Sequence, residues 1–298
     1  MILRAPAEAD APAVLAVVVA RDVADLGVPD CTLEDILEEW RAESFDAAAD
    51  ARLCETDTGE VVGYAVARRP GSVVAVSPDR EGLGAGTALL DWLEGRERAH
   101  GWEHHRQAIG ERNARAAGLL RSRGYGKVRS YHRMTVALAP GRQAPEPPAG
   151  VTLRELRPAA DEAVLYELDA AAFAGAADYS PETLLEFRER HVRAHDLDPA
   201  LSRVAERDLR PVGFLLARRW EQDSAGYVAI LAVHPREQGR GLGSALLGDA
   251  FAAFAAAGLS EGRLGVASDN PRALGLYERQ GMKPQFSFDV WERPISAA

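Results

Sequence analysis

The chain has few of the features that mark several large classes of protein. Its 298 residues include two cysteines, Cys31 and Cys54, too few for a disulfide framework, so a reducing, cytoplasmic location is expected. No uninterrupted apolar run is long enough to cross a bilayer. The longest candidate, residues 11–20, lies between Asp10 and Arg21, so we expect an amphipathic helix and neither a signal sequence nor a membrane anchor.

Positive charge is also in short supply. The 35 Lys and Arg residues against 45 Asp and Glu residues give a formal net charge of −10 at pH 7. This balance argues against nucleic acid as a partner. It is compatible with a cationic substrate, although acidic surfaces commonly serve only solubility. Nothing in the sequence indicates an oligomeric state.

The chain contains an internal repeat, in which one sequence unit occurs twice. Residues 63–69, GYAVARR, correspond to residues 213–219, GFLLARR, at an offset of 150. Farther along, Asn113 corresponds to Asn270 at an offset of 157. Seven residues are therefore inserted in the second copy, in a hairpin that follows Arg219, where extra length is tolerated at little cost.

A Pro-rich segment without hydrophobic periodicity separates the copies. We expect an N-terminal domain over residues 1–139, a linker over 140–150 and a C-terminal domain over 151–298. The second copy is expected to begin with a strand at 151–156, a helix at 159–173 and a second helix that has Ser180 as its N-cap, Pro181 at its first position and residues 183–191 following. Strands at 201–206, 212–219 and 227–233, a helix at 241–257, a strand at 263–267, a helix at 271–280 and a closing strand from 286 are expected to follow.

A glycine-rich turn occurs in each copy, between a β-branched run and an apolar helix. It reads HPREQGRGLG over residues 234–243 and SPDREGLGAG over residues 77–86. The backbone N–H groups at such a helix start form an anion site, and glycine lets the ligand approach the backbone. The turn is not a Walker A loop, because no Gly-Lys precedes Ser or Thr. It is not a dinucleotide fingerprint either, because Ser244 takes the sixth position and the turn comes late in its domain.

Two motifs of the second copy occur together in one known group of enzymes. Residues 238–243, QGRGLG, fit the pattern Gln/Arg-x-x-Gly-x-Gly/Ala, and Asn270, Ala273, Tyr277 and Gly281 fit a later Asn-Ala-Tyr-Gly signature. On these motifs the chain resembles the GNAT superfamily of N-acetyltransferases, and it does so in both copies. The resemblance implies a mixed α/β sheet whose fourth and fifth strands splay apart, with acetyl-CoA as the acetyl donor.

The resemblance also implies where acetyl-CoA is held. Its diphosphate would lie on the backbone N–H groups of residues 238–244, with Arg240 adding charge, and its pantetheine arm would pair with the strand that ends at Val233. The cofactor-binding residues implied in this way are Leu231, Ala232, Val233, Gln238, Gly239, Arg240, Gly241, Leu242, Gly243, Ser244 and Asn270.

The resemblance assigns Tyr277 as the donor of a proton to the departing CoA sulfur, although a packed aromatic residue on an amphipathic helix is the alternative. The second copy has no cysteine, so the amine is expected to attack directly in a ternary complex. His234 is a candidate general base or a surface residue at a strand end. Glu221 and Asp223 either recognise a positive acceptor or lie in a solvated turn. No residue spacing indicates a metal site.

The two copies are not equal at these positions. Glu81 stands where the second copy has Gln238, which brings a carboxylate toward the expected diphosphate, and Arg80 is available to offset it. Leu120 stands at the position of Tyr277 and cannot donate a proton. We therefore expect the second copy to carry the chemistry, and the first to be structural or to bind a ligand without turnover.

The acceptor is expected to be a primary amine of a small molecule or peptide, in a pocket shaped partly by Tyr179, His191 and His195. The tandem arrangement and Tyr277 are also similar to the mycothiol synthase family, which acetylates a cysteinyl amine of a thiol cofactor precursor. That family places a glutamate, taken to be its base, where this chain has Tyr227. A third alternative is a non-catalytic acyl-CoA-binding module.

Overall fold

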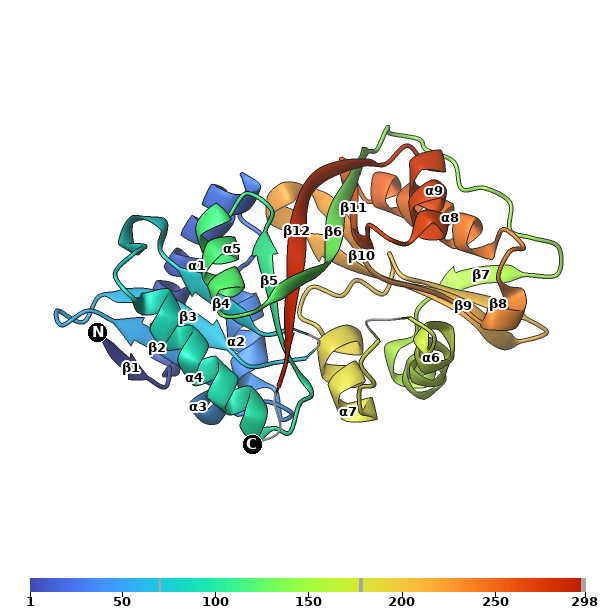
Figure 1. Cartoon of the computed structure of the whole chain (residues 1–298). Helices are drawn as coiled ribbons and strands as arrows, with labels where there is room; N and C mark the ends of the chain where they lie inside the picture. Colours follow the sequence, from blue (N-terminus) through green and yellow to red (C-terminus); the bar gives the residue numbers. More distant parts are fainter. Residues whose placement is uncertain (70, 177–178, 296–298) are drawn as a thin grey trace. The chain divides into compact units, whose positions relative to one another are not determined.

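The chain folds as two compact α/β units. The computed structural model describes residues 1–69, 71–176 and 179–295. The first unit comprises Met1–Tyr131 and the chain from Ser287 onward, and the second comprises His132–Phe286. Figure 1 shows helices and a twisted sheet in each unit, as predicted from the sequence. None of the helices within the described residues combines the length and the apolar character that a membrane span needs.

The first unit is built on an antiparallel sheet of order β1-β2-β3-β4. The elements of the first copy, in chain order, are β1 (Ile2–Arg4), α1 (Ala11–Leu26), α2 (Leu33–Arg41), α3 (Ala47–Asp50), β2 (Ala51–Glu55), β3 (Val61–Val66), β4 (Val73–Val76), α4 (Ala85–Ala99), β5 (His104–Gly110), α5 (Ala114–Ser122) and β6 (Gly126–Ala137).

The second copy repeats this order of elements apart from α3, and the second unit contains a sheet of order β7-β8-β9-β10-β11. The elements of the second copy are β7 (Thr152–Glu155), α6 (Pro158–Phe173), α7 (Leu184–Phe187) continued by a π-helical turn (Arg188–Val192), β8 (Arg203–Arg207), β9 (Arg210–Trp220), β10 (Ala225–Val233), α8 (Leu242–Ala256), β11 (Glu261–Ala267), α9 (Pro271–Arg279) and β12 (Lys283–Pro294).

Helices cover both faces of each sheet, because successive strand residues point to opposite sides. In the second unit, Phe214 and Leu216 of β9 pack with Leu165 of α6, whereas Leu215 and Ala217 belong to the cluster that contains α8. The first unit has the same arrangement, with α1 and α2 on one face and α4 on the other. The two copies thus share the same layers, and each glycine turn lies at the start of the helix that covers the face opposite α1 or α6, which is α4 or α8.

Two glycines allow α8 to lie close to the sheet of the second unit. Gly226 of β10 and Gly262 of β11 are partners in the parallel register. A Cβ atom on Gly226 would lie 2.2 Å from the ring of Phe254, and one on Gly262 would lie 2.7 Å from the ring of Phe251. Both phenylalanines are completely buried. These two positions therefore require glycine to accommodate the aromatic rings of the helix.

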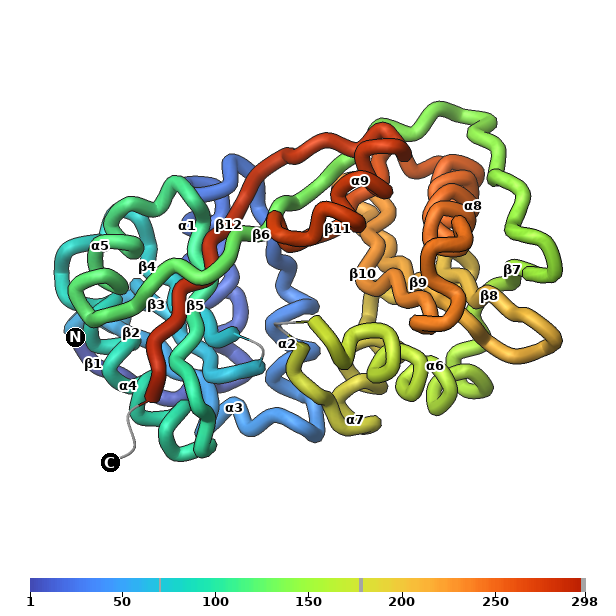
Figure 2. Tube along the Cα trace, turned by 45° about the vertical axis from the view of Figure 1, so that its right-hand side comes forward, coloured from blue at the N-terminus to red at the C-terminus, as the bar shows by residue number. Residues whose placement is uncertain are grey.

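The last strand of each copy is shared between the two units. The unit boundary falls within β6, after Tyr131, and within β12, after Phe286. In the first unit, the end of β12 pairs antiparallel with β5, from Phe288 opposite Gly110 to Pro294 opposite His104. Figure 2 shows this red C-terminal strand running beside β5. The C-terminal segment thus completes the sheet that contains β5.

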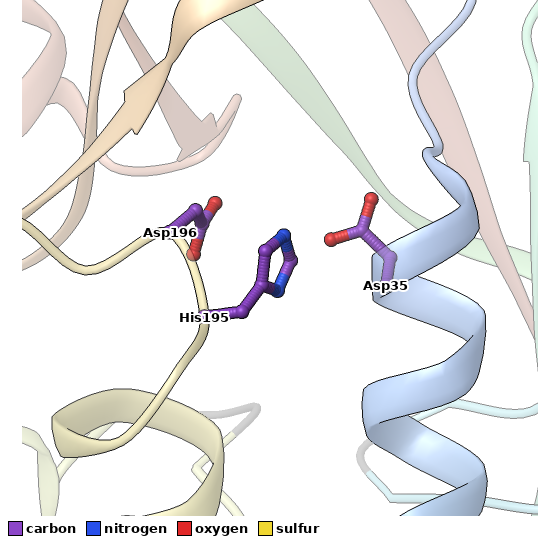
Figure 3. Close-up of side chains that lie close together, drawn as sticks. All are labelled: Asp35, His195 and Asp196. Carbon is purple, nitrogen blue, oxygen red and sulfur yellow. The ribbon is translucent and has the colours of Figure 1, made fainter.

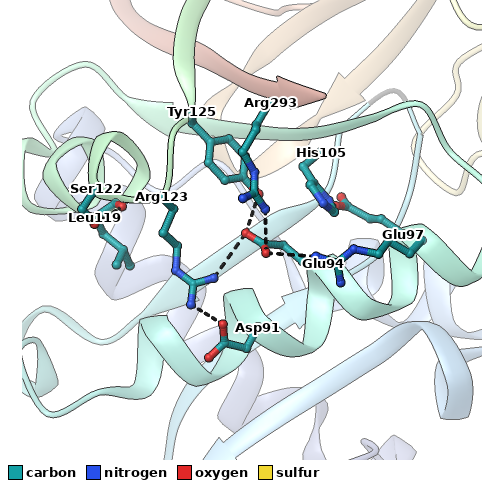
Figure 4. Close-up of polar contacts among 10 residues, drawn as sticks. Asp91, Glu94, Glu97, His105, Leu119, Ser122, Arg123, Tyr125 and Arg293 are labelled. Atoms are coloured by element: carbon teal, nitrogen blue, oxygen red, sulfur yellow. Dashed lines mark hydrogen bonds and ion pairs between the residues drawn. The ribbon is translucent and has the colours of Figure 1, made fainter. Parts of the chain in front are cut away.

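Partly buried ion pairs attach the C-terminal strand to the other elements of the first unit. Arg293 lies 2.7 Å from a carboxylate oxygen of Glu94 on α4, and Glu94 also accepts a hydrogen bond of 3.1 Å from the hydroxyl of Tyr125 (Figure 4). One residue earlier, Glu292 pairs with Arg106 at 2.6 Å. Glu94 is only 6% exposed and also lies 3.3 Å from Arg123, so two cations from separate elements compensate one poorly solvated carboxylate.

This division into units differs from the expected domain boundaries. The expected boundaries at 139/140 and 150/151 follow the two sequence copies, but each copy gives its last strand segment to the other unit. Residues 132–137 belong to the second unit, and the chain from Ser287 belongs to the first. The Pro-rich segment 140–150 also makes contacts along its length. Arg142 donates to Gln280 at 3.1 Å and stacks on the ring of Phe251, so the segment packs on the second unit.

One predicted helix start was wrong. Ser180 was expected to cap the second helix, but α7 begins at Leu184 and its N-cap is Thr183. The side chains of Thr183 and Glu186 each accept a hydrogen bond from the other residue's backbone N–H, at 3.2 and 2.6 Å. This capping box satisfies two backbone donors, whereas a cap at Ser180 would satisfy one.

Candidate active site

The glycine turn of the second copy has the backbone that the sequence predicts. Gly239 and Gly241 have φ angles of +79° and +83°, in the left-handed region that favours glycine. Gly241 is the N-cap of α8, and no side chain caps the helix there. The first backbone N–H groups of α8 are therefore available to an anion.

The first copy has the same turn. Gly82 and Gly84 have φ angles of +79° and +93°, and Gly84 is the N-cap of α4. The repeat seen in the sequence is thus a repeat of backbone conformation. Any difference in function between the two turns must come from the side chains around them.

The strand before the second turn separates from its parallel neighbour. Strand β10 pairs with β11 from Ala225 to Val228, whereas it stays paired with β9 as far as Val233. A bulge between Val228 and Ile230 marks the point of separation. The backbone of Leu231 to Val233 therefore forms an edge on the β11 side, as expected for a splayed fourth and fifth strand.

Side chains hold the turn of the second copy in shape. Gln238 donates a hydrogen bond of 3.1 Å to the carbonyl of Val233 and accepts one of 2.9 Å from Arg272. Arg240, expected to add charge for the diphosphate, is exposed and lies 3.4 Å from Glu237. Its charge is therefore partly offset within the protein.

Three further predicted binding residues have side chains that make contacts within the protein. Asn270 is the N-cap of α9, where its side-chain oxygen accepts from the N–H of Ala273 at 3.0 Å. Ser244 accepts a hydrogen bond of 3.1 Å from Gln280. Leu242 is buried, and its side chain belongs to the hydrophobic core of the second unit. The side-chain oxygen of Asn270 is thus engaged in capping α9.

Tyr277 lies on α9 and is only 9% exposed. Burial, assisted by the neighbouring Tyr227, raises the pKa of Tyr277 to about 12. The phenol therefore stays protonated throughout the neutral range and is able to donate a hydrogen bond. At the matching position of the first copy, Leu120 is buried in α5 and offers no donor.

An aromatic cluster surrounds Tyr227, the residue on the fourth strand. The rings of Tyr227 and Trp220 stack with centroids 4.5 Å apart and an angle of 7° between their planes. The guanidinium of Arg133 lies over both rings, 4.8 Å from the centroid of Tyr227 and 5.2 Å from that of Trp220. Sequence reasoning missed this cluster, because Arg133 comes from β6, almost a hundred residues earlier in the chain.

The candidate base and the inserted hairpin make local contacts. The Nδ1 atom of His234 accepts from the N–H of Arg236 at 3.2 Å, so His234 caps the short 3₁₀ turn over residues 235–237. Asp223 pairs with Arg263 at 2.5 Å, and the exposed Glu221 lies 3.6 Å from Arg219. These contacts explain the two hairpin carboxylates as parts of the local structure, and a catalytic role for His234 stays a prediction.

The region around the second helix contains a group of ionisable side chains. His191 lies 3.1 Å from the carboxylate of Glu182, whose backbone carbonyl accepts from the hydroxyl of Tyr166 at 2.9 Å. Burial, with a further contribution from Glu182, raises the pKa of Asp169 to about 7. Sequence reasoning did not single out Asp169, although a carboxylate in the apolar run DAAAF is a signal that would have found it.

The loop after α7 contributes a second polar group. His195 and Asp196 are adjacent in this loop (Figure 3). Asp196 accepts a hydrogen bond of 3.0 Å from the indole N–H of Trp220 and lies 3.4 Å from Arg218. Asp196 therefore fixes the indole that stacks on Tyr227, which links this loop to the aromatic cluster.

The residues of the second copy fit acetyl-CoA. The turn offers uncapped N–H groups for the diphosphate, the edge of β10 offers backbone groups for the amides of the arm, and Tyr277 offers a donor for the thioester sulfur. A helix of 15 residues behind the turn adds its dipole to the anion site.

Comparison with known proteins identifies the family. The sequence profile of the acetyltransferase (GNAT) family matches residues 21–125 and again 163–282, so the chain belongs to this family, with two domains in tandem. It is an acetyl-CoA-dependent N-acetyltransferase.

Curated relatives carry a more specific name. The mycothiol acetyltransferase of Catenulispora acidiphila is 30% identical over 303 aligned positions, which cover 94% of each chain. That of Streptomyces bingchenggensis is 33% identical over 241 positions, covering 77% of this chain and 76% of the relative.

Solved structures show the same tandem fold. A GCN5-related N-acetyltransferase from Sphaerobacter thermophilus is similar with a TM-score of 0.78 and 28% identity, over 100% of this chain and 96% of the other. A tandem GNAT protein from the clavulanic acid biosynthesis pathway is similar with a TM-score of 0.76 and 16% identity, over 100% and 99%. The second likeness is one of fold alone.

Proposed function

We propose that the chain transfers the acetyl group of acetyl-CoA to the cysteinyl amine of a mycothiol precursor, with the chemistry in the second copy. The observation that carries this proposal is the match to mycothiol acetyltransferases along 94% of both chains. It favours the cysteinyl amine over the broader class of small-molecule and peptide amines expected from the sequence.

The turn and the strand edge are proposed to hold the donor. The N–H groups of residues 238–244 would bind the diphosphate, and the backbone of Leu231, Ala232 and Val233 would bind the arm. Gln238 supports this role by fixing the shape of the turn, because its amide bridges Val233 and Arg272. Asn270 would contribute by starting α9, which carries Tyr277.

The reaction replaces a C–S bond by a C–N bond. The amine nitrogen loses its proton to a base, and the sulfur departs as a thiolate that takes up a proton from solvent. A thiol has a pKa of about 8.5, below the value of about 12 for Tyr277, so complete transfer of the tyrosine proton to the sulfur is unfavourable. We propose that Tyr277 donates a hydrogen bond that stabilises the charge developing on sulfur.

Tyr227 is the main departure from the mycothiol synthase pattern. It cannot replace a glutamate as a base, and it is stacked on Trp220 beneath the Arg133 guanidinium. This cluster is a specific reason to keep a second candidate function, acetylation of another small amine. His234 and Asp169 are the candidates for the base, Asp169 because a pKa of about 7 suits proton transfer near neutrality.

The test compares acceptors under identical conditions. Acetyl transfer from labelled acetyl-CoA is measured by mass spectrometry with the desacetyl cysteinyl precursor of mycothiol, the same molecule with its amine blocked, and a panel of polyamines, amino sugars and peptides. Transfer to the cysteinyl amine at a kcat/KM at least about a hundredfold above the panel supports the proposal.

The other outcomes contradict the proposal. Preferential transfer to a panel amine would favour the second candidate function. Acetyl-CoA binding without transfer to any acceptor would leave an acyl-CoA-binding module.

The cytoplasmic location stays a prediction that rests on the two free cysteines, Cys31 and Cys54.

A further inference from the structure

The first unit contains a cavity of about 340 Å³ beside its glycine turn. This volume is at the lower end of the range for small-molecule sites, about 300–1,000 Å³. Most of its wall is apolar and comes from β4, β5, α4 and α5, through Val74, Val76, Leu90, Ile109, Leu119 and Leu120. Leu120 adds to the apolar wall at the position where the second copy has its tyrosine.

A chain of ion pairs lies along the polar side of this cavity. Arg21 of α1 pairs with Glu81 of the glycine turn and lies 2.9 Å from Asp25. Arg115 of α5 lies 3.5 Å from the other carboxylate oxygen of Glu81. Asn113, the N-cap of α5, donates to Asp25 at 2.9 Å. Helix α1, the turn and α5 are thus joined through side chains of the protein itself.

The second copy lacks this arrangement. By the repeat offset of 150, Arg21 and Asp25 correspond to Ala171 and Gly175. Gln238, the counterpart of Glu81, is neutral and accepts from Arg272, the counterpart of Arg115. The ion-pair chain is therefore a property of the first copy and not of the shared fold.

The negative charge of Glu81 is offset by other arginines than the sequence suggested. Arg80 was expected to offset the carboxylate, but it pairs with Glu60 at 2.9 Å. Arg21 and Arg115 take this role instead, and both are then engaged by a carboxylate of the chain. A diphosphate at the turn would meet the negative charge of Glu81 and would find these two cations already paired.

We propose that the cavity of the first copy binds a small, uncharged ligand that combines apolar groups with neutral hydrogen-bond acceptors, and that Glu81 is the residue that rejects the diphosphate of coenzyme A. The apolar wall supplies the contact surface, and the backbone N–H groups of the turn are left for neutral acceptor atoms. The inference does not depend on which amine the second copy acetylates.

The first experiment measures ligand binding to the full chain by calorimetry. Acetyl-CoA is expected to saturate one site per chain, in the second copy. With that site saturated, pantetheine, which has the arm of coenzyme A without its phosphates, is expected to bind once more. Ala116→Phe, which fills the cavity from α5, should abolish this second event and leave acetyl-CoA binding unchanged. Two acetyl-CoA sites in the wild-type chain, or no pantetheine binding, overturns the proposal.

The second experiment changes the charge at the turn. Glu81→Gln removes the repulsion and releases Arg115, whereas Arg21 keeps its pair with Asp25, so a second acetyl-CoA site should appear with an affinity raised at least about tenfold. Arg21→Met leaves the carboxylate in place and should create no second site. Glu8→Gln, which breaks the surface pair with Arg41 elsewhere in this unit, is the matched control.

The outcomes separate this inference from the proposed function. A second site in Arg21→Met but not in folded Glu81→Gln would mean that the arginine side chain, and not the charge of Glu81, blocks the ligand, which overturns the inference. A wild-type chain that binds no acetyl-CoA would contradict the proposed function, whereas a single site gained in Glu81→Gln would still support the role of Glu81.

Discussion

The rings of Trp220 and Tyr227 lie almost parallel, at 7°, with their centroids 4.5 Å apart. Both residues belong to the hairpin in which the second copy has its seven-residue insertion, Trp220 at the end of β9 and Tyr227 near the start of β10. The insertion therefore does more than lengthen a loop, because it carries an aromatic pair on the stretch of β10 just before β10 separates from β11.

Tyr227 should act through its ring and not through its hydroxyl. We expect Tyr227→Ala to raise the acceptor KM about tenfold and to lower the free energy of unfolding by about 1 kcal/mol, because the stacked pair is lost. Tyr227→Phe keeps the stack and should remain within about twofold of the wild type. Steady-state kinetics and urea denaturation measure both effects. A large loss of kcat in Tyr227→Phe would give the hydroxyl a catalytic role and contradict this prediction.

Tyr277→Phe tests the proposed donor to the sulfur. We expect kcat to fall about a hundredfold while the KM for acetyl-CoA changes less than about twofold, because the hydroxyl acts on the charge that develops during the reaction. Tyr64→Phe is the control, since Tyr64 is a buried tyrosine of the first unit whose hydroxyl accepts from Trp40. Equal loss of kcat in both variants would point to a general effect on folding.

The pH dependence of kcat follows from the same residue. Because burial raises the pKa of Tyr277 to about 12, its ionisation should cause no alkaline loss of activity below about pH 10. The measurement is a pH–rate profile for the wild type. An alkaline limb near pH 8 or 9 that disappears in Tyr277→Phe would contradict the prediction.

The two glycine turns offer a matched pair of substitutions. A Cβ atom on Gly243 would lie 3.5 Å from Leu276, and one on Gly86 would lie 3.6 Å from Leu119, so alanine fits both sites without strain. The family pattern allows alanine at the position of Gly243, so a bulkier residue is needed for the test. We expect Gly243→Leu to weaken acetyl-CoA binding about tenfold, because the larger side chain intrudes on the diphosphate site. Gly86→Leu should leave this affinity unchanged. Unaltered affinity in folded Gly243→Leu would remove the support for a diphosphate on this turn.

Asp169 should make stability depend on pH. Its pKa is raised to about 7 in the folded protein, chiefly by burial, from 3.8 when unfolded. Between these values the unfolded chain holds fewer protons, so stability is lost as pH rises from 4 to 7. Asp169→Asn should therefore stabilise the protein at pH 8, by on the order of 2 kcal/mol, with the gain vanishing near pH 4.

Another aspartate of α6 provides the control for this measurement. Burial alone would raise the pKa of Asp161, but hydrogen bonds from Arg154 bring it below its usual value. Asp161→Asn should therefore destabilise the protein at pH 8, by on the order of 2 kcal/mol. Chemical denaturation at several pH values compares the two variants, and the same sign for both would contradict the assignment of Asp169.

Local features of the fold could be predicted from the sequence. The left-handed backbone at Gly239 and Gly241 follows from the glycine spacing, because other residues adopt that conformation at a cost. Asn270 precedes a helix in the position that a side-chain cap requires. Tyr277 could be singled out only through its place in a family motif, since its helix position is equally typical of a core residue.

Long-range features could not be predicted in this way. Nothing in the sequence of α1 indicates that Arg21 meets Glu81, 60 residues farther along the chain. The placement of Arg133 over Tyr227 depends on which sheet receives the second half of β6. Strand β12 has the same apolar alternation whichever unit its ends join, so its pairing with β5 could be known only from the structure.

The sharing of β6 and β12 affects how the gene duplication can evolve. After most duplications, a copy that loses its activity is free to be deleted. Here, deleting the first half of the gene would also remove residues 132–137 from the other unit, and deleting the second half would remove the partner of β5. Loss of either half would therefore take a strand from the sheet of the half that remains.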